Sequence, residues 1–177
     1  MQNKKPSASA QIAEIAICAM LGSIMFCSKI IMELFPNIHL IGVLTIAYTV
    51  VFRAKALIPI YVYVMLNGLF AAFSPWWVPY LYIWTVLWGA TMLLPRHLPK
   101  KLAAVVYPVL CMLHGLLFGV LYAPAQAIMF DLTLEQTIAW IIAGLPFDLL
   151  HTIGNLALGL LVLPIVKTLT KLKRQLR

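Results

Sequence analysis

The stretch QIAEIAICAMLGSIMFCSKIIMEL, residues 11–34, decides the fold class, because it is a long apolar run with few charges. About 20 such residues are enough for a helix to cross the hydrocarbon core of a bilayer. Similar runs fill the rest of the chain, so that 63% of its 177 residues are hydrophobic and 10% are charged. Soluble domains average about 45–50% apolar and about 25% charged residues. The composition therefore predicts an all-α integral membrane protein and excludes a soluble domain, a disordered chain and a disulfide scaffold. The runs are continuously apolar rather than alternating, which also argues against an outer-membrane barrel.

Turn-forming stretches divide the chain into six runs. Three of the breaks are Phe-Pro-Asn at 35–37, Ser-Pro-Trp-Trp at 74–77 and Pro-Arg-His-Leu-Pro at 95–99. We expect membrane spans at 11–34, 39–52, 56–73, 78–94, 102–122 and 134–169. The last run is long enough to begin at the membrane interface before it crosses. The whole chain, 1–177, is predicted to be one compact bundle of six transmembrane helices, with an N-terminal stub at 1–10 and a basic tail at 170–177.

The distribution of cations predicts the orientation of these spans. Given six spans, every lysine and arginine except Lys29 falls on one side of the membrane: Lys4, Lys5, Arg53, Lys55, Arg96, Lys100, Lys101, Lys167, Lys171, Lys173, Arg174 and Arg177. Cytoplasmic loops of membrane proteins carry an excess of Lys and Arg. Both termini are therefore expected to be cytoplasmic. The cations behind the net charge of +8 are therefore interpreted as signals for membrane orientation, and they give no reason to expect a nucleic-acid partner.

Polar residues inside apolar spans are candidates for a binding site, because ionisable groups in lipid are costly unless they face the bundle interior or water. Lys29 and Glu33 stand four residues apart near the outer end of the first span, and Asn37 and His39 follow at the same depth. The pair either snorkels to the interface as an internal ion pair or lines a pocket that opens outward. A contact between Lys29 and Asp148 would also neutralise both charges.

The last span carries the densest polar stripe. Asp148, His151, Thr152 and Asn155 recur at i, i+3, i+4 and i+7, which places them on one face of a helix. Pro146 is expected to kink the helix just before this stripe. Such polar groups also hold packed helices together in membranes. A carboxylate, an imidazole and an amide on one stripe favour a wall that faces a ligand.

Other residues complete the predicted pocket. Asn67 and His114 could close the ring, although each alone is more typical of a packing residue. Trp77 and Tyr80 belong to an aromatic stretch that either anchors the chain at the interface or covers a flat ligand. The candidate substrate-binding residues are Lys29, Glu33, Asn37, His39, Asn67, Trp77, Tyr80, His114, Asp148, His151 and Asn155.

No pattern in the sequence predicts an enzyme, a metal centre or a bound cofactor. The chain contains no His-Glu-x-x-His, no Gly-x-Ser-x-Gly and no phosphate-binding loop. Cys18, Cys27 and Cys111 all lie in apolar runs, where cysteine packs as a small apolar residue. Without a nucleotide site, active transport would need energy from partner subunits or from an ion gradient.

Small residues repeat along the first span at Ala19, Ser23 and Cys27. Four-residue spacing of small side chains lets helices approach closely in lipid. This face is expected either to pack within the bundle or to dock on a separate membrane subunit.

Three local runs carry a resemblance to a known family: FPNIHL at 35–40, WWVPYLYIW at 76–84 and GLPFDLLH at 144–151. With the six short spans and the basic C-terminus, the chain resembles the substrate-binding S component of an energy-coupling factor (ECF) vitamin transporter. The resemblance covers nearly the whole sequence. It implies a bacterial cytoplasmic-membrane protein that binds a vitamin or cofactor precursor near the outer surface.

The resemblance also implies partners. In that family an Ala-x-x-x-Ala face on the first span contacts a transmembrane coupling subunit, two ATP-binding-cassette ATPases supply energy, and the S component topples to carry its ligand inward. Here Ala19, Ser23 and Cys27 occupy the corresponding face. The alternative is a self-sufficient, ion-coupled secondary carrier in which Asp148 and His151 relay protons.

Overall fold

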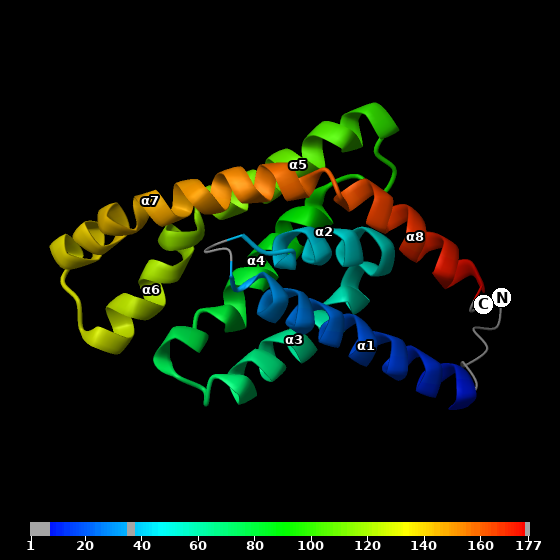
Figure 1. Cartoon of the computed structure of the whole chain (residues 1–177), viewed down its shortest axis with the longest axis horizontal. Coiled ribbons are helices and arrows are strands. Elements are labelled where there is room, and N and C mark those ends of the chain that lie inside the picture. The colour runs from blue at the N-terminus through cyan, green and yellow to red at the C-terminus, as the bar shows by residue number, and fades with distance from the viewer. Residues whose placement is uncertain (1–7, 35–37, 176–177) are drawn as a thin grey trace.

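A computed structural model describes residues 8–34 and 38–175, and this part of the chain is helical with no strand (Figure 1). Its elements in order are α1 (Ala8–Met32), α2 (Ile41–Phe52), η1 (Arg53–Ala56), α3 (Leu57–Phe70), η2 (Pro75–Trp77), α4 (Tyr80–Leu93), α5 (Lys100–Leu116), α6 (Phe118–Phe130), α7 (Leu134–Gly159) and α8 (Val162–Gln175). The predicted all-helical fold is confirmed for the described residues.

Four helical segments of the described chain are long and apolar enough to cross a membrane: Gln11–Met32, Ile41–Phe70, Lys100–Phe130 and Leu134–Gly159. The second of these includes the 3-10 turn η1, where Arg53 adopts a left-handed φ of 57° and the chain changes direction (Figure 1). Helix α4 has 14 residues and is shorter than a typical span. The six-span count and the cytoplasmic termini stay predictions.

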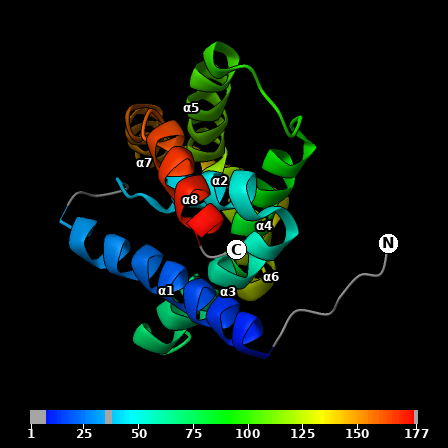
Figure 2. The ribbon, with the colours of Figure 1, turned by 90° about the vertical axis from the view of Figure 1, so that its right-hand side faces the viewer.

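Helix α2 forms the centre of the molecule. Nine consecutive residues from Ile41 to Thr49 are buried, as expected for a helix that is apolar all round. The helix packs against α4 and α8, and Figure 2 shows it behind α8 and beside α4. Tyr48 donates a hydrogen bond to the Leu21 carbonyl of α1 at 3.2 Å. At the end of α2, Lys173 of α8 donates to the Val51 carbonyl at 2.7 Å.

The prediction of one continuous span at 134–169 was wrong, because the chain forms two helices there, α7 and α8, with a break at residues 160–161. Helix α7 begins with a capping box: Thr133 accepts from the Gln136 amide, and the Gln136 side chain accepts from the Thr133 amide. Helix α8 turns its apolar side, which includes buried Val162, toward the core. Residues 170–175 of the predicted tail thus belong to a helix, and 176–177 lie outside the described residues.

The predicted end of the fifth span at residue 122 was also wrong. Helix α5 ends at Leu116, and α6 continues from Phe118 to Phe130 with Pro124 inside it. A proline removes one backbone donor, and a membrane helix tolerates this where neighbouring groups compensate. At the other end of the chain, α1 begins at Ala8, within the predicted stub, and residues 1–7 lie outside the described residues.

Candidate functional site

Five aromatic side chains from five different elements meet in the interior: His39, Trp84, His114, Phe118 and His151, here called the cage. They come from the segment before α2 and from α4, α5, α6 and α7 in turn. The ring centroids of His39 and His151 lie 4.8 Å apart, those of Phe118 and His151 4.8 Å, and those of Trp84 and His114 5.4 Å. Segments far apart in the sequence therefore build a single site.

Three tyrosines form a second layer around the cage. Tyr63 of α3 and Tyr80 of α4 lie edge-on to Trp84, at centroid distances of 6.1 and 5.9 Å. Tyr122 of α6 lies 5.9 Å from Phe118 and stacks on Trp140 of α7 at 5.8 Å. Edge-to-face and stacked contacts are both favourable arrangements of aromatic rings, so the cage is closely packed on the α3, α4 and α6 sides.

Several buried polar atoms at and beside the cage have no hydrogen-bond partner among the described residues. Four belong to the cage: His39 Nδ1, Trp84 Nε1, His114 Nδ1 and His151 Nε2. The others belong to neighbouring amides: Nδ2 and Oδ1 of Asn67, and Oδ1 of Asn155. An unsatisfied buried donor or acceptor costs about 1–3 kcal/mol, and most native proteins contain few. Such a concentration marks a place where a polar ligand would stabilise the protein.

The predicted stripe on α7 is buried in three of its four positions. Asp148, His151 and Asn155 are buried, and Thr152 is half-buried and donates to the Asp148 carbonyl at 2.6 Å. His151 faces the cage. Asn155, one turn further along α7, donates from Nδ2 to the Cys111 carbonyl of α5 at 3.0 Å. The stripe thus includes both cage residues and groups that join helices.

Asp148 lies at the break between α5 and α6. Its two carboxylate oxygens accept from the backbone N–H of Gly119 at 3.2 and 3.1 Å. An anion is stabilised at a helix N-terminus, where backbone N–H groups are free. Gly119 is needed for this approach, because a Cβ there would lie 2.4 Å from Oδ2 of Asp148. The contact explains why a new helix begins at residue 118.

We expect Asp148→Ala to lower the free energy of unfolding by about 1–3 kcal/mol, because it leaves the buried Gly119 N–H without its acceptor. Asp148→Asn keeps an oxygen at this position and should lose less. Denaturation in mixed micelles measures both, with Asp131→Asn as the control, because Asp131 is exposed and asparagine tolerates its left-handed backbone conformation. Equal stability of the alanine variant and the unchanged protein would contradict this role.

The charged pair of α1 lies apart from Asp148. Lys29 Nζ is 3.4 Å from Glu33 Oε1, and it also lies 5.8 Å from the ring centroid of Trp76. The considered contact between Lys29 and Asp148 is not formed. Asn37, the next predicted polar residue, lies outside the described residues.

The predicted aromatic stretch at 74–80 connects three helices. Trp77 donates to the Val64 carbonyl of α3 at 2.7 Å, and Tyr122 of α6 donates to the Trp76 carbonyl. Tyr80 contacts Trp84 as well as Tyr122, at a centroid distance of 6.5 Å. The structure therefore joins Tyr80 to the cage and uses Trp77 as an anchor on α3.

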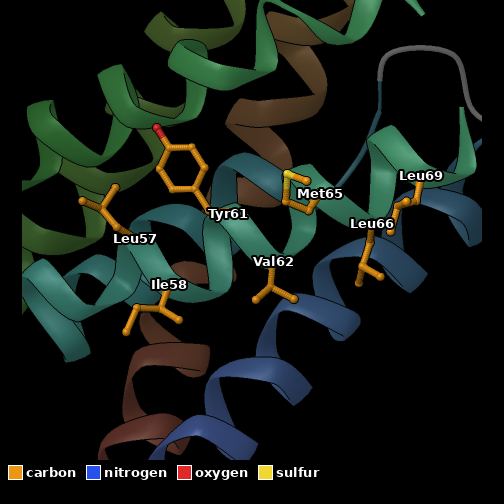
Figure 3. Close-up of a pocket in the computed structure, with 7 residues that line it drawn as sticks. All are labelled: Leu57, Ile58, Tyr61, Val62, Met65, Leu66 and Leu69. Carbon is orange, nitrogen blue, oxygen red and sulfur yellow. The ribbon is translucent and has the colours of Figure 1, made fainter. Parts of the chain in front are cut away.

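The structure also contains a groove of about 650 Å³ on the other side of α3 (Figure 3). Its lining is apolar except for one tyrosine hydroxyl: Leu57, Ile58, Tyr61, Val62, Met65, Leu66 and Leu69. That hydroxyl donates to the Leu81 carbonyl at 2.8 Å. The buried face of α3 carries Tyr63 and Asn67 instead. The groove thus lacks the free polar atoms that concentrate near the cage.

The three small residues of α1 are exposed. Ala19, Ser23 and Cys27 all face outward, and the Ser23 hydroxyl donates to the Ala19 carbonyl at 3.0 Å. On the opposite side, buried Leu21 and Met25 join the core, and α1 packs along α3. The small-residue face is therefore not used for packing within the described bundle.

Two aromatic residues of the cage were not among the predicted site residues. Trp84 and Phe118 lie in apolar runs, where aromatic residues are ordinary and give no contrast. His39, His114 and His151 were predicted. No protein-family model, curated protein or solved structure matches this chain.

Proposed function

We propose that this chain is the substrate-binding subunit of an ATP-driven importer of the ECF type, which captures a vitamin or cofactor precursor at the extracellular face. The observation that carries the proposal is the cage, where nitrogens of three imidazoles and one indole are buried together with no hydrogen-bond partner in the described part of the chain. Ligand sites in proteins are mostly apolar and aromatic, with a few convergent polar groups. The cage has this composition.

The proposed topology has six spans, formed by α1, α2, α3, α4, the pair α5–α6, and α7. Both termini and the basic turns are cytoplasmic, in agreement with the positive-inside rule. Helix α8 then lies at the cytoplasmic interface, where its exposed Lys167, Lys171 and Arg174 meet water and headgroups. The turn at 71–79 lies on the outer side, which puts the binding site on the extracellular half.

Partners complete the proposed transport cycle. A transmembrane coupling subunit would dock on the exposed small-residue face of Ala19, Ser23 and Cys27, because small side chains permit close helix contact in lipid. Two ABC-type ATPases would use ATP, and this chain would bind no cofactor of its own. The proposed location is the bacterial cytoplasmic membrane, with no role for nucleic acid.

The test is the small molecule that the gently purified protein retains in native mass spectrometry. Wild type is expected to retain one compound, and His151→Leu should weaken its binding by about tenfold, the equivalent of one lost hydrogen bond. The matched control is Thr91→Val, because the Thr91 hydroxyl is also buried but bonds only within α4, to the Leu87 carbonyl.

Two outcomes would contradict the proposal. One is equal retention by wild type and His151→Leu. The other is uptake by this chain alone in ATP-free vesicles under a pH gradient, which would identify a secondary carrier instead.

A further inference from the structure

The charges around the cage limit the class of ligand that it would bind, an inference that rests on the proposed function. Lys29 pairs with Glu33 at 3.4 Å. Asp148 directs both oxygens at the Gly119 amide. In the described part of the chain, no ion pair or cation–π contact joins a charged side chain to a cage ring. A buried charge without a partner is far more costly than a buried polar group, so the part of a ligand that enters the cage is uncharged.

The free atoms of the cage also have definite hydrogen-bond roles. The indole N–H of Trp84 can only donate. His114 Nε2 lies 3.3 Å from the Ile83 carbonyl, which can only accept, so Nε2 carries the proton and Nδ1 of the neutral ring accepts. Asn155 uses Nδ2 on the Cys111 carbonyl, which leaves its Oδ1 as an acceptor. A ligand must therefore offer both an acceptor and donors.

Asn67 can offer a ligand a hydrogen-bond donor and an acceptor together. Its side chain is 0% exposed, and both Nδ2 and Oδ1 have no partner among the described residues. It lies one turn after Tyr63 on the buried face of α3, and Tyr63 is in edge contact with Trp84. A carboxamide presents a donor and an acceptor side by side. Its complement is a planar edge with an adjacent acceptor and donor, as in the recognition of adenine by asparagine.

The surrounding rings require a flat ligand. Trp84 is 1% exposed and is in contact with Tyr63, Tyr80, His114 and Phe118 at centroid distances between 5.4 and 6.1 Å. These rings already contact one another, so any ligand has to enter between them, and a planar heterocycle, which can stack or lie edge-on against them, parts them least.

We propose that the part of the ligand that enters the cage is an uncharged planar heterocycle whose edge carries an adjacent donor and acceptor, such as a lactam or an amino group beside a ring nitrogen, and that this edge pairs with Asn67. Trp84 donates to a second acceptor of the ring, and His114 Nδ1 and Asn155 Oδ1 accept from its remaining donors. A carboxylate, phosphate or ammonium group, if the molecule has one, stays outside the cage.

The experiment identifies the compound retained by the full-length protein and compares three variants. Wild type, Asn67→Leu, Lys29→Met and Thr91→Val are purified in the same mild detergent, and the released compound is identified by accurate mass and ultraviolet spectrum. Asn67→Leu is expected to bind about 10- to 100-fold more weakly, the range for one bidentate pair. Thr91→Val should bind as wild type does, whereas Lys29→Met, a change at a predicted pocket residue, measures whether a charge contributes to affinity. Because the Asn67 amide has no partner among the described residues, Asn67→Leu should melt no lower than ligand-free wild type, which separates lost binding from lost folding.

The possible results separate this inference from the proposed function. A retained heterocycle with the paired edge, lost from Asn67→Leu, supports both. A retained compound without that edge, one that needs Lys29 for affinity, or full retention by Asn67→Leu overturns the ligand class and leaves ligand capture standing. Retention of no small molecule by wild type overturns ligand capture and the ligand class together.

Discussion

Replacement of Trp84 by alanine is expected to lower the free energy of unfolding by about 3 kcal/mol, the low end of the range for a buried Trp→Ala change. Trp84 is fully enclosed and contacts rings from α3, α4, α5 and α6. The low end applies because separated helices in a membrane stay in lipid, so that lost packing contacts, rather than exposure to water, dominate the loss. Unfolding in mixed micelles with increasing denaturing detergent measures the effect.

Trp84→Phe tests the indole N–H apart from the packing. Phenylalanine keeps an aromatic ring in the cage and removes Nε1, which has no partner among the described residues. We expect its stability to stay much closer to wild type than that of Trp84→Ala, while the affinity for the retained compound falls about tenfold, as for one hydrogen bond.

Trp76→Ala is the matched control, because this side chain is 39% exposed and lies outside the cage. Its effect on stability should be well below that of Trp84→Ala. A Trp84→Ala variant as stable as Trp76→Ala would show that the cage rings do not support the fold. Wild-type affinity in Trp84→Phe would show that the indole N–H does not contact the ligand.

Composition and apolar run length were sufficient to predict an all-helical chain, because lipid leaves a spanning backbone little alternative to the helix. The ends of α5 and α7 could not be predicted in this way. The start of α6 depends on Asp148, which is 29 residues away from Gly119 in the sequence. Prolines did not predict the helix ends either. Pro108, Pro124 and Pro146 all lie inside helices, because contacts with neighbouring helices determine whether a missing backbone donor ends a helix.

The polar residues of the site could be predicted from the sequence, whereas the cage aromatics Trp84 and Phe118 could not. A histidine or asparagine stands out in an apolar run, so His114, His151 and Asn155 could be named from their cost in lipid. Trp84 and Phe118 could not, since an aromatic residue in a membrane span is equally at home against lipid. The Lys29–Asp148 contact was considered because both were charged, but Glu33 lies one helical turn from Lys29 and is in reach without any tertiary contact.

Gly159→Ala and Gly144→Ala, the same change in the same helix, are expected to have opposite effects on stability. Helix α7 packs along α5, and a Cβ at Gly159 would lie 2.6 Å from Cα of Pro108 and 3.1 Å from its Cβ. No atom lies within 4 Å of a Cβ at Gly144. Neither glycine has a positive φ, so alanine is compatible with the backbone at both positions and only the neighbours differ.

The clash at Gly159 is with the backbone of a proline inside a helix, which cannot rotate away as a flexible side chain would. The two helices must separate there, at a cost of about 1–3 kcal/mol, as for other overpacked sites. Gly144→Ala should instead gain about 0.5–1 kcal/mol, because alanine loses less backbone entropy in a helix than glycine does. Unfolding in mixed micelles compares the two variants directly.

A destabilised Gly144→Ala would mean that its side of α7 is closely packed, and an unaffected Gly159→Ala would mean that α5 and α7 are further apart at this end than the structure has them. Because His114 and His151 lie on these same two helices, separation at Gly159 should also widen the cage, so that Gly159→Ala loses affinity for the retained compound while Gly144→Ala keeps it.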